Sequence, residues 1–443
     1  MLASASVEVS PELDVAACIF ASRGAEERYF VWEQPDRDGF ALGTLGVEWT
    51  VEGIADPERF SAAAAACADA TRDATRAVRG SGPPASGPVW VGGFSFDTAG
   101  GEAPHWASLP PTLLVLPSVS LVRYKDEVVA TVNVACRADS DPEILAGSAA
   151  ARLETLRADP IPLVDPDPRE RFEIVSVRPP EHYVEAVAEA RELIRCGKLE
   201  KVVLAREVRV EARSPFRLAV VFDELRQAFP SCFCFCVGTP EGGFVGASPE
   251  LLVRREGGGV ASVALAGSTR RSADPAVDDH LGQRLLQSPK DRSEHEIVAR
   301  RIERALAPLS VWVAANAEPE LIRVANIQHL ATPVRAQLAE PLSAVELAGV
   351  LHPTPGVGGE PWEVACEVMA LEQMDRGWYA GPVGWMDAAE DGEFCVALRC
   401  ALVNGTVGHC YAGVGVVADS DPEAELAESE VKLQALLTVL AGP

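Results

Sequence analysis

Two pairs of acidic residues recur at helical spacing and could hold a cation. Asp291 and Glu294 are three residues apart in "DRSEHE", and Glu425 and Glu428 are three apart in "AELAESE". Residues at this spacing lie on one face of a helix, so the two carboxylates of each pair would repel one another. Either solvent screens them or a metal ion lies between them. Such oxygen-rich sites suit Mg²⁺, and the spacing alone leaves both interpretations open.

A lysine and a glutamate at the starts of two strand-like segments could act as base and acid. Lys201 opens the alternating run in "LEKVVLAREVRV", and Glu250 opens the one in "GASPELLVRR". Burial or neighbouring cations would favour a neutral amine, which can accept a proton, and a dry pocket would favour a protonated carboxyl, which can donate one. The alternative is a surface ion pair, which the spacing does not exclude.

Other familiar chemical motifs are absent from the sequence. There is no G-x-x-x-x-G-K-[ST] loop, no G-x-S-x-G elbow and no H-E-x-x-H motif, and "AGVGVVAD" lacks the third glycine of a dinucleotide fingerprint. Cys232, Cys234 and Cys236 in "SCFCFCVG" alternate along the chain, which places all three on one face of a strand. We interpret them as small apolar residues of a core strand and not as zinc ligands.

The composition indicates an acidic globular protein. The 443 residues are 48% hydrophobic and carry a formal net charge of -26. Such a chain repels nucleic acids and anionic membranes, so an anionic ligand must be held locally by a metal ion, buried arginines or backbone amides. The N-terminal segment has neither a basic start nor a long apolar run, so we expect no signal peptide and no membrane helix. Eleven scattered cysteines fit a cytoplasmic protein without disulfides.

Two regions of sequence are expected to position these residues. Residues 1–165, an N-terminal α/β lobe, alternate strand-like runs such as "VWVGGFSFD" with an Ala-rich helical run, "PERFSAAAAACADATRDATRAV". A Pro- and Asp-rich segment separates them from residues 170–443. Strands and helices occur in clusters and not in strict alternation. The sequence therefore predicts an α+β fold, a two-lobed mixed α/β sandwich with large sheets flanked by helices, and not a doubly wound parallel sheet.

The region 170–443 begins with a helical pattern that leads directly into the strand of Lys201. The pattern is "PPEHYVEAVAEARELIRCGKL", and Gly197 near its end is a typical signal for the C-terminus of a helix. The apolar positions at helical spacing are Tyr183, Val187, Ala190 and Ile194.

Nine segments, in order from about residue 170 to the C-terminus, resemble the chorismate-utilising enzymes. They are "KLEKVVLAR", "GASPELLVRR", "ALAGSTRR", "KDRSEHEIV", "IQHLATPV", "LHPTPGVGG", "DRGWYAGPVGW", "FCVALRCA" and "YAGVGVVADSDPEAELAESEVK". Nine ordered segments make the resemblance specific, and within the family it is strongest to the isochorismate synthases. Residues 1–165 resemble the family's N-terminal lobe only weakly, chiefly through "VGGFSFD". The resemblance implies the family's fold, with 170–443 as the chorismate-binding catalytic region.

The resemblance implies that the acidic pairs form a Mg²⁺ site. Glu294 and Glu428 match the family's metal-binding glutamates, with Glu425 and Asp291 in nearby supporting positions. The ion would bridge them to the ring carboxylate of chorismate, which explains how an acidic protein accepts a dianionic substrate.

The resemblance also implies a substrate pocket. Arg399 and Tyr379 match the pair that meets the carboxylate of the enolpyruvyl group, and arginine suits that task because its planar fork donates two hydrogen bonds to a carboxylate. The alternative for Arg399 is a buried ion pair. The remaining substrate-binding positions implied by the resemblance are Gly267, Ser268, His329, Gly356, Gly413 and Lys432.

The lysine and glutamate acquire roles from the same resemblance. The residue that matches Lys201 is the general base that activates water for attack at C2 of the ring, and the one that matches Glu250 protonates the departing C4 hydroxyl. Each positioned proton transfer is worth on the order of 10² to 10⁴ in rate. The implied activity is the Mg²⁺-dependent, reversible isomerisation of chorismate to isochorismate, which feeds menaquinone or siderophore biosynthesis.

Sequence features distinguish this chain from the ammonia-using relatives. Those enzymes carry a "PAGT"-like loop where this chain has "HPTPGVGG", with Gly356 where isochorismate synthases often show alanine. The covalent lysine of some aminodeoxychorismate synthases is replaced here by Ala266. We therefore expect no glutamine amidotransferase subunit, and a monomer. Two alternatives stay open: a salicylate synthase, which also eliminates pyruvate, and a non-catalytic chorismate-binding subunit.

Overall fold

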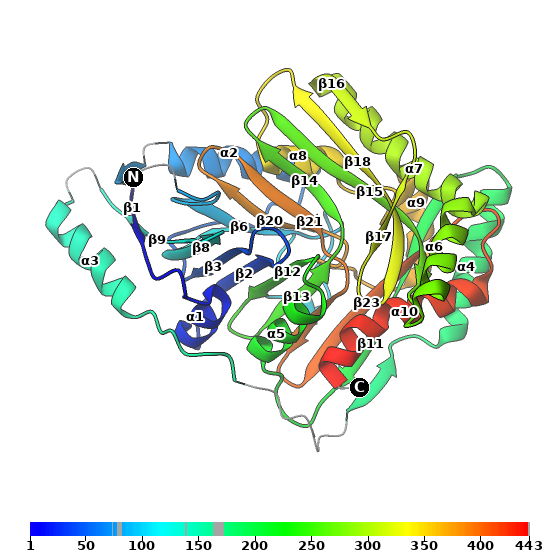
Figure 1. The fold of residues 1–443 in the computed structure, drawn as a ribbon, viewed down its shortest axis with the longest axis horizontal. Coiled ribbons are helices and arrows are strands. Elements are labelled where there is room, and N and C mark those ends of the chain that lie inside the picture. The colour runs from blue at the N-terminus through cyan, green and yellow to red at the C-terminus, as the bar shows by residue number, and fades with distance from the viewer. Residues whose placement is uncertain (73, 78–81, 138–139, 163–171, 442–443) are drawn as a thin grey trace.

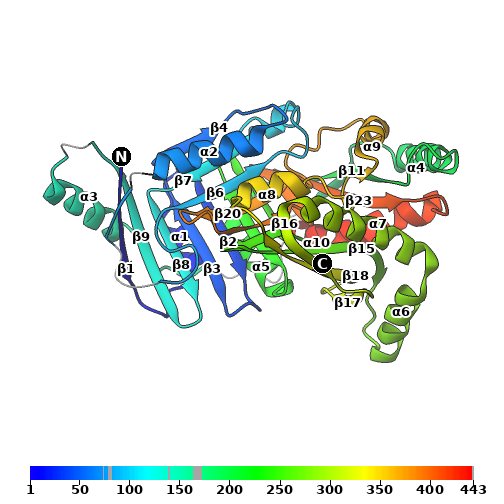
Figure 2. The same ribbon diagram turned by 90° about the horizontal axis from the view of Figure 1, so that it is seen from above.

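The computed structural model describes residues 1–72, 74–77, 82–137, 140–162 and 172–441. The predicted boundary between 165 and 170 lies outside the described residues. Two large sheets pack against each other through a shared apolar core, and helices cover their outer faces (Figure 1; Figure 2). The predicted α+β sandwich of large sheets flanked by helices is confirmed.

The larger sheet contains thirteen strands of the described chain. Its continuous order is β10 (Glu173–Ser176), β11 (Lys201–Glu211), β23 (Val407–Val416), β22 (Cys400–Asn404), β13 (Gly242–Ser248), β12 (Phe233–Gly238), β2 (Tyr29–Gln34), β3 (Phe40–Leu45), β8 (Val119–Tyr124), β9 (Glu127–Ala135), β1 (Leu2–Glu8) and β5 (Thr75–Ala77). The short strand β19 (Gly359–Glu360) pairs with β11 beside this path. The pairing of β1 with β5 is parallel, whereas β11 and β23 form a long antiparallel pair.

The smaller sheet contains ten strands of the described chain. Its order is β16 (Ser310–Ala315), β18 (Ile327–Leu338), β15 (Gly259–Arg270), β14 (Leu251–Glu256), β21 (Gly392–Val396), β20 (Pro382–Asp387), β6 (Val89–Phe94), β7 (Thr112–Leu116) and β4 (Trp49–Glu52), with β17 (Glu320–Arg323) paired to β18.

Helices lie on both outer faces. The described helices are α1 (Val15–Ser22), α2 (Arg59–Thr71), α3 (Pro142–Glu154), α4 (Pro180–Arg195), α5 (Leu218–Ala228), α6 (Pro275–Gln287), α7 (Pro289–Leu306), α8 (Ala344–Leu351), α9 (Trp362–Met369) and α10 (Pro422–Ala441), with 3₁₀ turns η1 (Pro104–Trp106), η2 (Ala307–Leu309) and η3 (Ala370–Glu372). Helices α1, α5 and α10 pack on the larger sheet, and α7 and α8 pack on the smaller one. Figure 1 shows α10, in red, beside β23.

Both regions of the sequence contribute strands to both sheets. Strand β2 of the N-terminal region pairs with β12 in the larger sheet, and β6 pairs with β20 in the smaller sheet. The sequence division between 1–165 and 170–443 therefore does not correspond to a division between the two sheets. The N-terminal strands extend the same two layers that position the residues of the C-terminal region.

The helix that precedes Lys201 forms as predicted. The four apolar residues of α4 at helical spacing are buried, and Gly197 follows the helix with a positive φ of 73°, the left-handed conformation that glycine adopts without strain. The chain then enters β11 at Lys201. Cys232, Cys234 and Cys236 are buried and unpaired, at or next to β12, as expected for apolar core residues.

The Ala-rich helix is shorter than predicted. The pattern over residues 57–78 predicts one helix, but α2 ends at Thr71 and residues 75–77 form β5. Strand β5 pairs with β1 at the edge of the larger sheet, with Thr75 opposite Ala3. Pairing with a sheet edge therefore outweighs the helical preference of the alanines in this segment, and the β-branched threonine is itself suited to a strand.

Candidate active site

One cavity, with about 600 Å³ of empty space including its opening to solvent, is lined by most of the predicted site residues. It is bordered by strands β11 and β23 of the larger sheet, by β15 and β18 of the smaller sheet, and by helices α7 and α10. The predicted residues that line it are Glu250, Gly267, Ser268, Glu294, His329, Gly356, Tyr379, Arg399, Gly413, Glu428 and Lys432.

The four predicted carboxylates lie close to one another, on α7 and α10. Glu294 and Glu428 line the cavity, whereas Asp291 and Glu425 stand behind them and do not. Burial raises the pKa of Asp291, and the charges of Glu294 and Glu428 raise it further. Burial likewise raises the pKa of Glu425, with Glu428 adding to the effect. The carboxylates are therefore close enough to repel one another.

Two of the carboxylates on α10 are paired with lysines. Lys432 lies one helical turn beyond Glu428 on α10 and is 2.7 Å from its carboxylate. Its ammonium also donates to the backbone oxygen of Gly413 at 3.1 Å. Lys290 donates to Glu425 at 2.6 Å, outside the cavity lining. Burial alone would raise the pKa of Glu428, but Lys432 and the hydroxyl of a neighbouring serine lower it.

Lys201 is fully buried, at 0% exposure, behind the cavity wall. Its Nζ lies 2.9 Å from Glu294 Oε1, but the angle does not suit a hydrogen bond, and Nζ has no hydrogen-bond partner among the described residues. Gly415 on β23 makes the approach possible. A Cβ on Gly415 would lie 2.1 Å from Glu294 Oε1 and 2.9 Å from Lys201 Cε.

Gly415 is a residue that the sequence analysis missed. It lies in "AGVGVVAD", where the sequence analysis assigned a substrate-binding role to Gly413 but none to Gly415. The available signal was the unusual use of two glycines in a strand pattern, because glycine in a strand often marks a close approach of other groups.

Glu250 is an uncommonly buried acid. It is 2% exposed, and burial raises the pKa of its carboxyl to about 7, although Lys201 and Arg399 act in the opposite direction. Ser248 accepts from its backbone N–H, and the Glu250 carbonyl accepts from Val396, so the residue is fixed between β13, β14 and β21. At neutral pH a large fraction of this carboxyl is protonated and can donate a proton.

Arg399 offers a guanidinium to the cavity. Within the described chain no carboxylate forms an ion pair with it, so the predicted alternative of a buried ion pair does not hold there. Its Nη2 lies 3.3 Å from Nε2 of His329. Burial lowers the pKa of His329 to about 3, assisted by the charge of Arg399, so the imidazole is neutral and can accept from the guanidinium. Burial raises the pKa of Tyr379, which keeps its hydroxyl protonated.

Three glycines shape the cavity surface. Gly267 has a φ of 73° and lies at a bulge in β15, which directs Ser268 to donate to Glu428 at 2.6 Å. A Cβ on Gly413 would lie 2.8 Å from the hydroxyl of Tyr379. A Cβ on Gly356 would lie 3.3 Å from a carboxylate oxygen of Glu250. Because glycine has no side chain at Gly413 and Gly356, the Tyr379 hydroxyl and the Glu250 carboxylate are left open to a molecule bound in the cavity.

The acidic residues supply the hard oxygen donors that Mg²⁺ prefers. Two carboxylates face the cavity and two more lie behind them, so the donor set fits such an ion. Among the described residues, however, no three of these carboxylates bring donor atoms within 4.8 Å of one another. Side-chain rotation away from the lysines would be needed to bring three of them around one ion.

Comparison with known proteins gives a consistent result. The family profile described as chorismate binding enzyme matches residues 1–441. The chain belongs to the chorismate-binding enzymes. This chorismate-binding enzyme is 35% identical over 363 residues to the isochorismate synthase MenF of Bacillus subtilis, covering 81% of this chain and 76% of that protein. It is 34% identical over 453 residues to the salicylate biosynthesis isochorismate synthase of Pseudomonas aeruginosa, covering 100% and 90%.

A solved structure extends the similarity to the whole fold of this chorismate-binding enzyme. MenF, the menaquinone-specific isochorismate synthase from Escherichia coli, superposes with a TM-score of 0.79 at 25% sequence identity, covering 99% of this chain and 95% of that chain. No described helix is both long and apolar enough to span a membrane.

We predict that Glu250 titrates near pH 7, far above a solvent-exposed glutamate. The measurement is the carboxyl ¹³C shift of protein labelled in glutamate, with the resonance assigned by its loss in Glu250→Gln. In Lys201→Met the titration should move to higher pH, because the removed cation favours the charged carboxylate. A Glu250 resonance that titrates near pH 4.5 would contradict the buried acid.

Proposed function

We propose that the protein is an isochorismate synthase, an isomerase that converts chorismate reversibly to isochorismate. Water adds at C2 of the ring while the C4 hydroxyl leaves as a second water molecule, so the composition of the substrate is unchanged. The observation that carries the proposal is a buried lysine behind one cavity and a buried, partly protonated glutamate in its lining, beside a guanidinium that has no acidic partner among the described residues.

Lys201 and Glu250 would perform the two proton transfers. Lys201, after its ammonium has lost a proton, would take a proton from the attacking water, and the protonated carboxyl of Glu250 would donate one to the departing hydroxyl. Hydroxide is a poor leaving group, so a donor that keeps its proton near neutral pH supports the second role. Glu250 meets that requirement because burial raises its pKa to about 7.

The substrate's two carboxylates would be bound at separate places. Arg399 and Tyr379 would meet the enolpyruvyl carboxylate, with His329 holding the guanidinium from behind. The ring carboxylate would lie near the bulge at Gly267 and Ser268, on the side of the acidic residues.

Glu294 and Glu428 would hold Mg²⁺, supported by Glu425 and Asp291. When bound, the ion would neutralise the ring carboxylate and screen it from the acidic residues. Glu294 also contacts Lys201, so metal binding and the base are linked through one side chain. Lys432 would balance the charge of Glu428 and orient the backbone at Gly413.

The names of the relatives described above refer to different biosynthetic pathways, so we propose the pathway that uses the isochorismate separately from the reaction itself. We propose a cytoplasmic monomer that acts on free chorismate without a glutamine amidotransferase subunit and supplies menaquinone or siderophore biosynthesis. The absence of a lysine at Ala266, which lines the cavity, supports chemistry with water instead of a covalent amine.

The test is proton NMR of chorismate incubated with the purified protein, with Mg²⁺ and then with EDTA, in the absence of ammonia. We predict a Mg²⁺-dependent mixture of chorismate and isochorismate that forms without pyruvate. Salicylate with equimolar pyruvate would instead identify a salicylate synthase, and an unchanged spectrum would indicate a non-catalytic binding subunit.

Lys201→Ala and Glu250→Gln should each lower the rate of isochorismate formation by roughly 10²-fold or more. The matched controls are the exposed Lys198→Ala and Glu256→Gln, which should retain full rate.

We also predict that Gly415→Ala lowers turnover strongly while the protein stays folded. The added methyl group would overlap Glu294 and crowd Lys201, and both are ends of side chains that can move away. Isomerase rate and thermal unfolding are measured together. Gly408→Ala in the same strand is the control, since its nearest neighbour would be an apolar carbon of Leu440 at 3.1 Å. Equal rates for the two variants would mean that the Lys201–Glu294 contact is not needed.

A further inference from the structure

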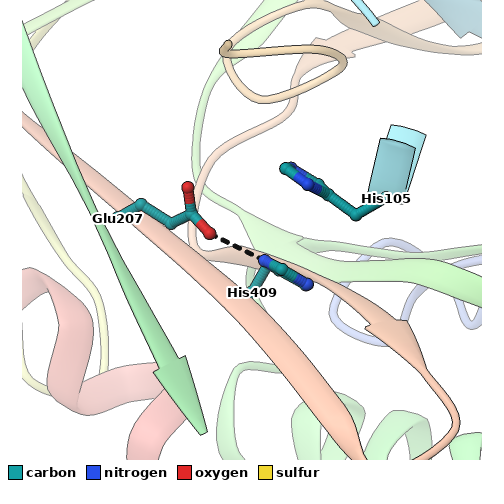
Figure 3. A group of neighbouring side chains, drawn as sticks. All are labelled: His105, Glu207 and His409. Carbon is teal, nitrogen blue, oxygen red and sulfur yellow. Dashed lines mark hydrogen bonds and ion pairs between the residues drawn. The ribbon is translucent and has the colours of Figure 1, made fainter. Parts of the chain in front are cut away.

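A second cluster of polar side chains lies outside the cavity lining. His105 in η1, Glu207 on β11 and His409 on β23 place one potential ligand atom each within 4.8 Å of one another (Figure 3). They are the only described residues of their types to do so in a group of three or more. None of them has a role in the proposed reaction, and His105 comes from the N-terminal region.

The side chains are held in place by contacts with one another. The imidazoles of His105 and His409 are stacked, with centroids 4.3 Å apart and ring planes 9° from parallel. Nδ1 of His409 lies 2.7 Å from Glu207 Oε1. Figure 3 shows the Glu207 carboxylate beside the two stacked rings. Nε2 of His105 lies 3.3 Å from the hydroxyl of Tyr411, an outer contact of the kind that orients imidazole ligands in metal sites.

The charges of the cluster favour a dication. His105 and His409 each offer a ring nitrogen as a ligand when the imidazole is neutral. Glu207 is 9% exposed and pairs with His409, and within the described chain no lysine or arginine forms an ion pair with it. One carboxylate and two neutral imidazoles carry a net charge of -1. A divalent ion bound to them would give the site a net charge of +1.

We propose that His105, Glu207 and His409 bind a divalent transition-metal ion of the Zn²⁺ class, at a site separate from the acidic residues of the cavity. Two imidazole nitrogens and one carboxylate oxygen are a donor set typical of Zn²⁺ and its neighbours, whereas Mg²⁺ strongly prefers oxygen donors. Ligands of a tetrahedral Zn²⁺ lie about 3.3 Å apart, given bond lengths near 2.0 Å. Closure from 4.8 Å therefore requires movement of about 1.5 Å at most, together with rotation of the stacked imidazoles so that a nitrogen of each ring points toward the ion.

The location gives an ion both a way in and a contact with the cavity. His105 is half-buried, so the cluster is accessible from solvent without unfolding. Tyr411, which contacts His105, lines the cavity and stacks on Tyr379 with ring centroids 5.3 Å apart. A metal ion at this cluster would therefore lie one side chain away from the cavity wall.

The experiment is a Co²⁺ titration of the full-length protein followed by visible absorption, repeated with Zn²⁺ by calorimetry in the presence of excess Mg²⁺. The exposed thiol of Cys196 is replaced by serine in every sample, because it is a competing soft ligand. We expect one strong site per chain that Mg²⁺ does not displace. Glu207→Gln, which keeps the shape of the side chain, and His105→Ala should each weaken binding at least about 10-fold. The exposed His280→Ala is the matched control and should bind as the parent does.

Equal affinity in Glu207→Gln, His105→Ala and the control would overturn the proposal, as would complete displacement by Mg²⁺ or the absence of a strong site in the parent. Thermal unfolding without metal is measured for each variant, so that loss of binding is interpreted only in folded protein. Added Zn²⁺ should raise the unfolding midpoint of the parent and the His280 variant but not of the two cluster variants.

Discussion

The burial of Lys201 beside Glu294 is the constraint on which the rest of the site depends. Moving the Lys201 ammonium or the Glu294 carboxylate from water into the interior costs several kcal/mol, and the contact between the two charges offsets part of that cost. Lys201 begins β11 in the larger sheet, whereas Glu294 lies on α7, which packs on the smaller sheet. Their contact therefore requires both layers to be in place, and Gly415 supplies the space for it. The polar groups of the cavity are assembled around a pair that neither layer could bury alone.

Charge balance explains how an acidic chain can receive an anionic ligand. The protein carries a formal net charge of -26, yet three glutamates near the cavity are paired with lysines. Arg399 adds a guanidinium without an acidic partner among the described residues, and neutral His329 supports it without competing for the anion. The local field at the cavity thus differs from the average field of the surface, because a few buried cations act in a low dielectric.

Sequence patterns predicted the elements and residues whose signal is local. The helix before Lys201, the core cysteines and the acidic pairs on α7 and α10 follow from spacing of side chains along one element. The early end of α2, the sharing of both sheets by the two regions and the place of Gly415 depend on partners far away in the sequence. Glu425 lies behind the cavity lining and pairs with Lys290, a lysine that the pattern of carboxylates did not include. Long-range pairing decided each of these features.

The most direct test of the mechanism is whether oxygen from the solvent enters the product. The reaction is run in H₂¹⁸O and stopped when only a small fraction of the chorismate has been converted to isochorismate. Water activated by Lys201 should place one ¹⁸O in the C2 hydroxyl of isochorismate, detected by mass spectrometry of the product. Isochorismate that forms without label would mean that the hydroxyl migrates within the substrate, and the account of Lys201 as a water-activating base would then be wrong.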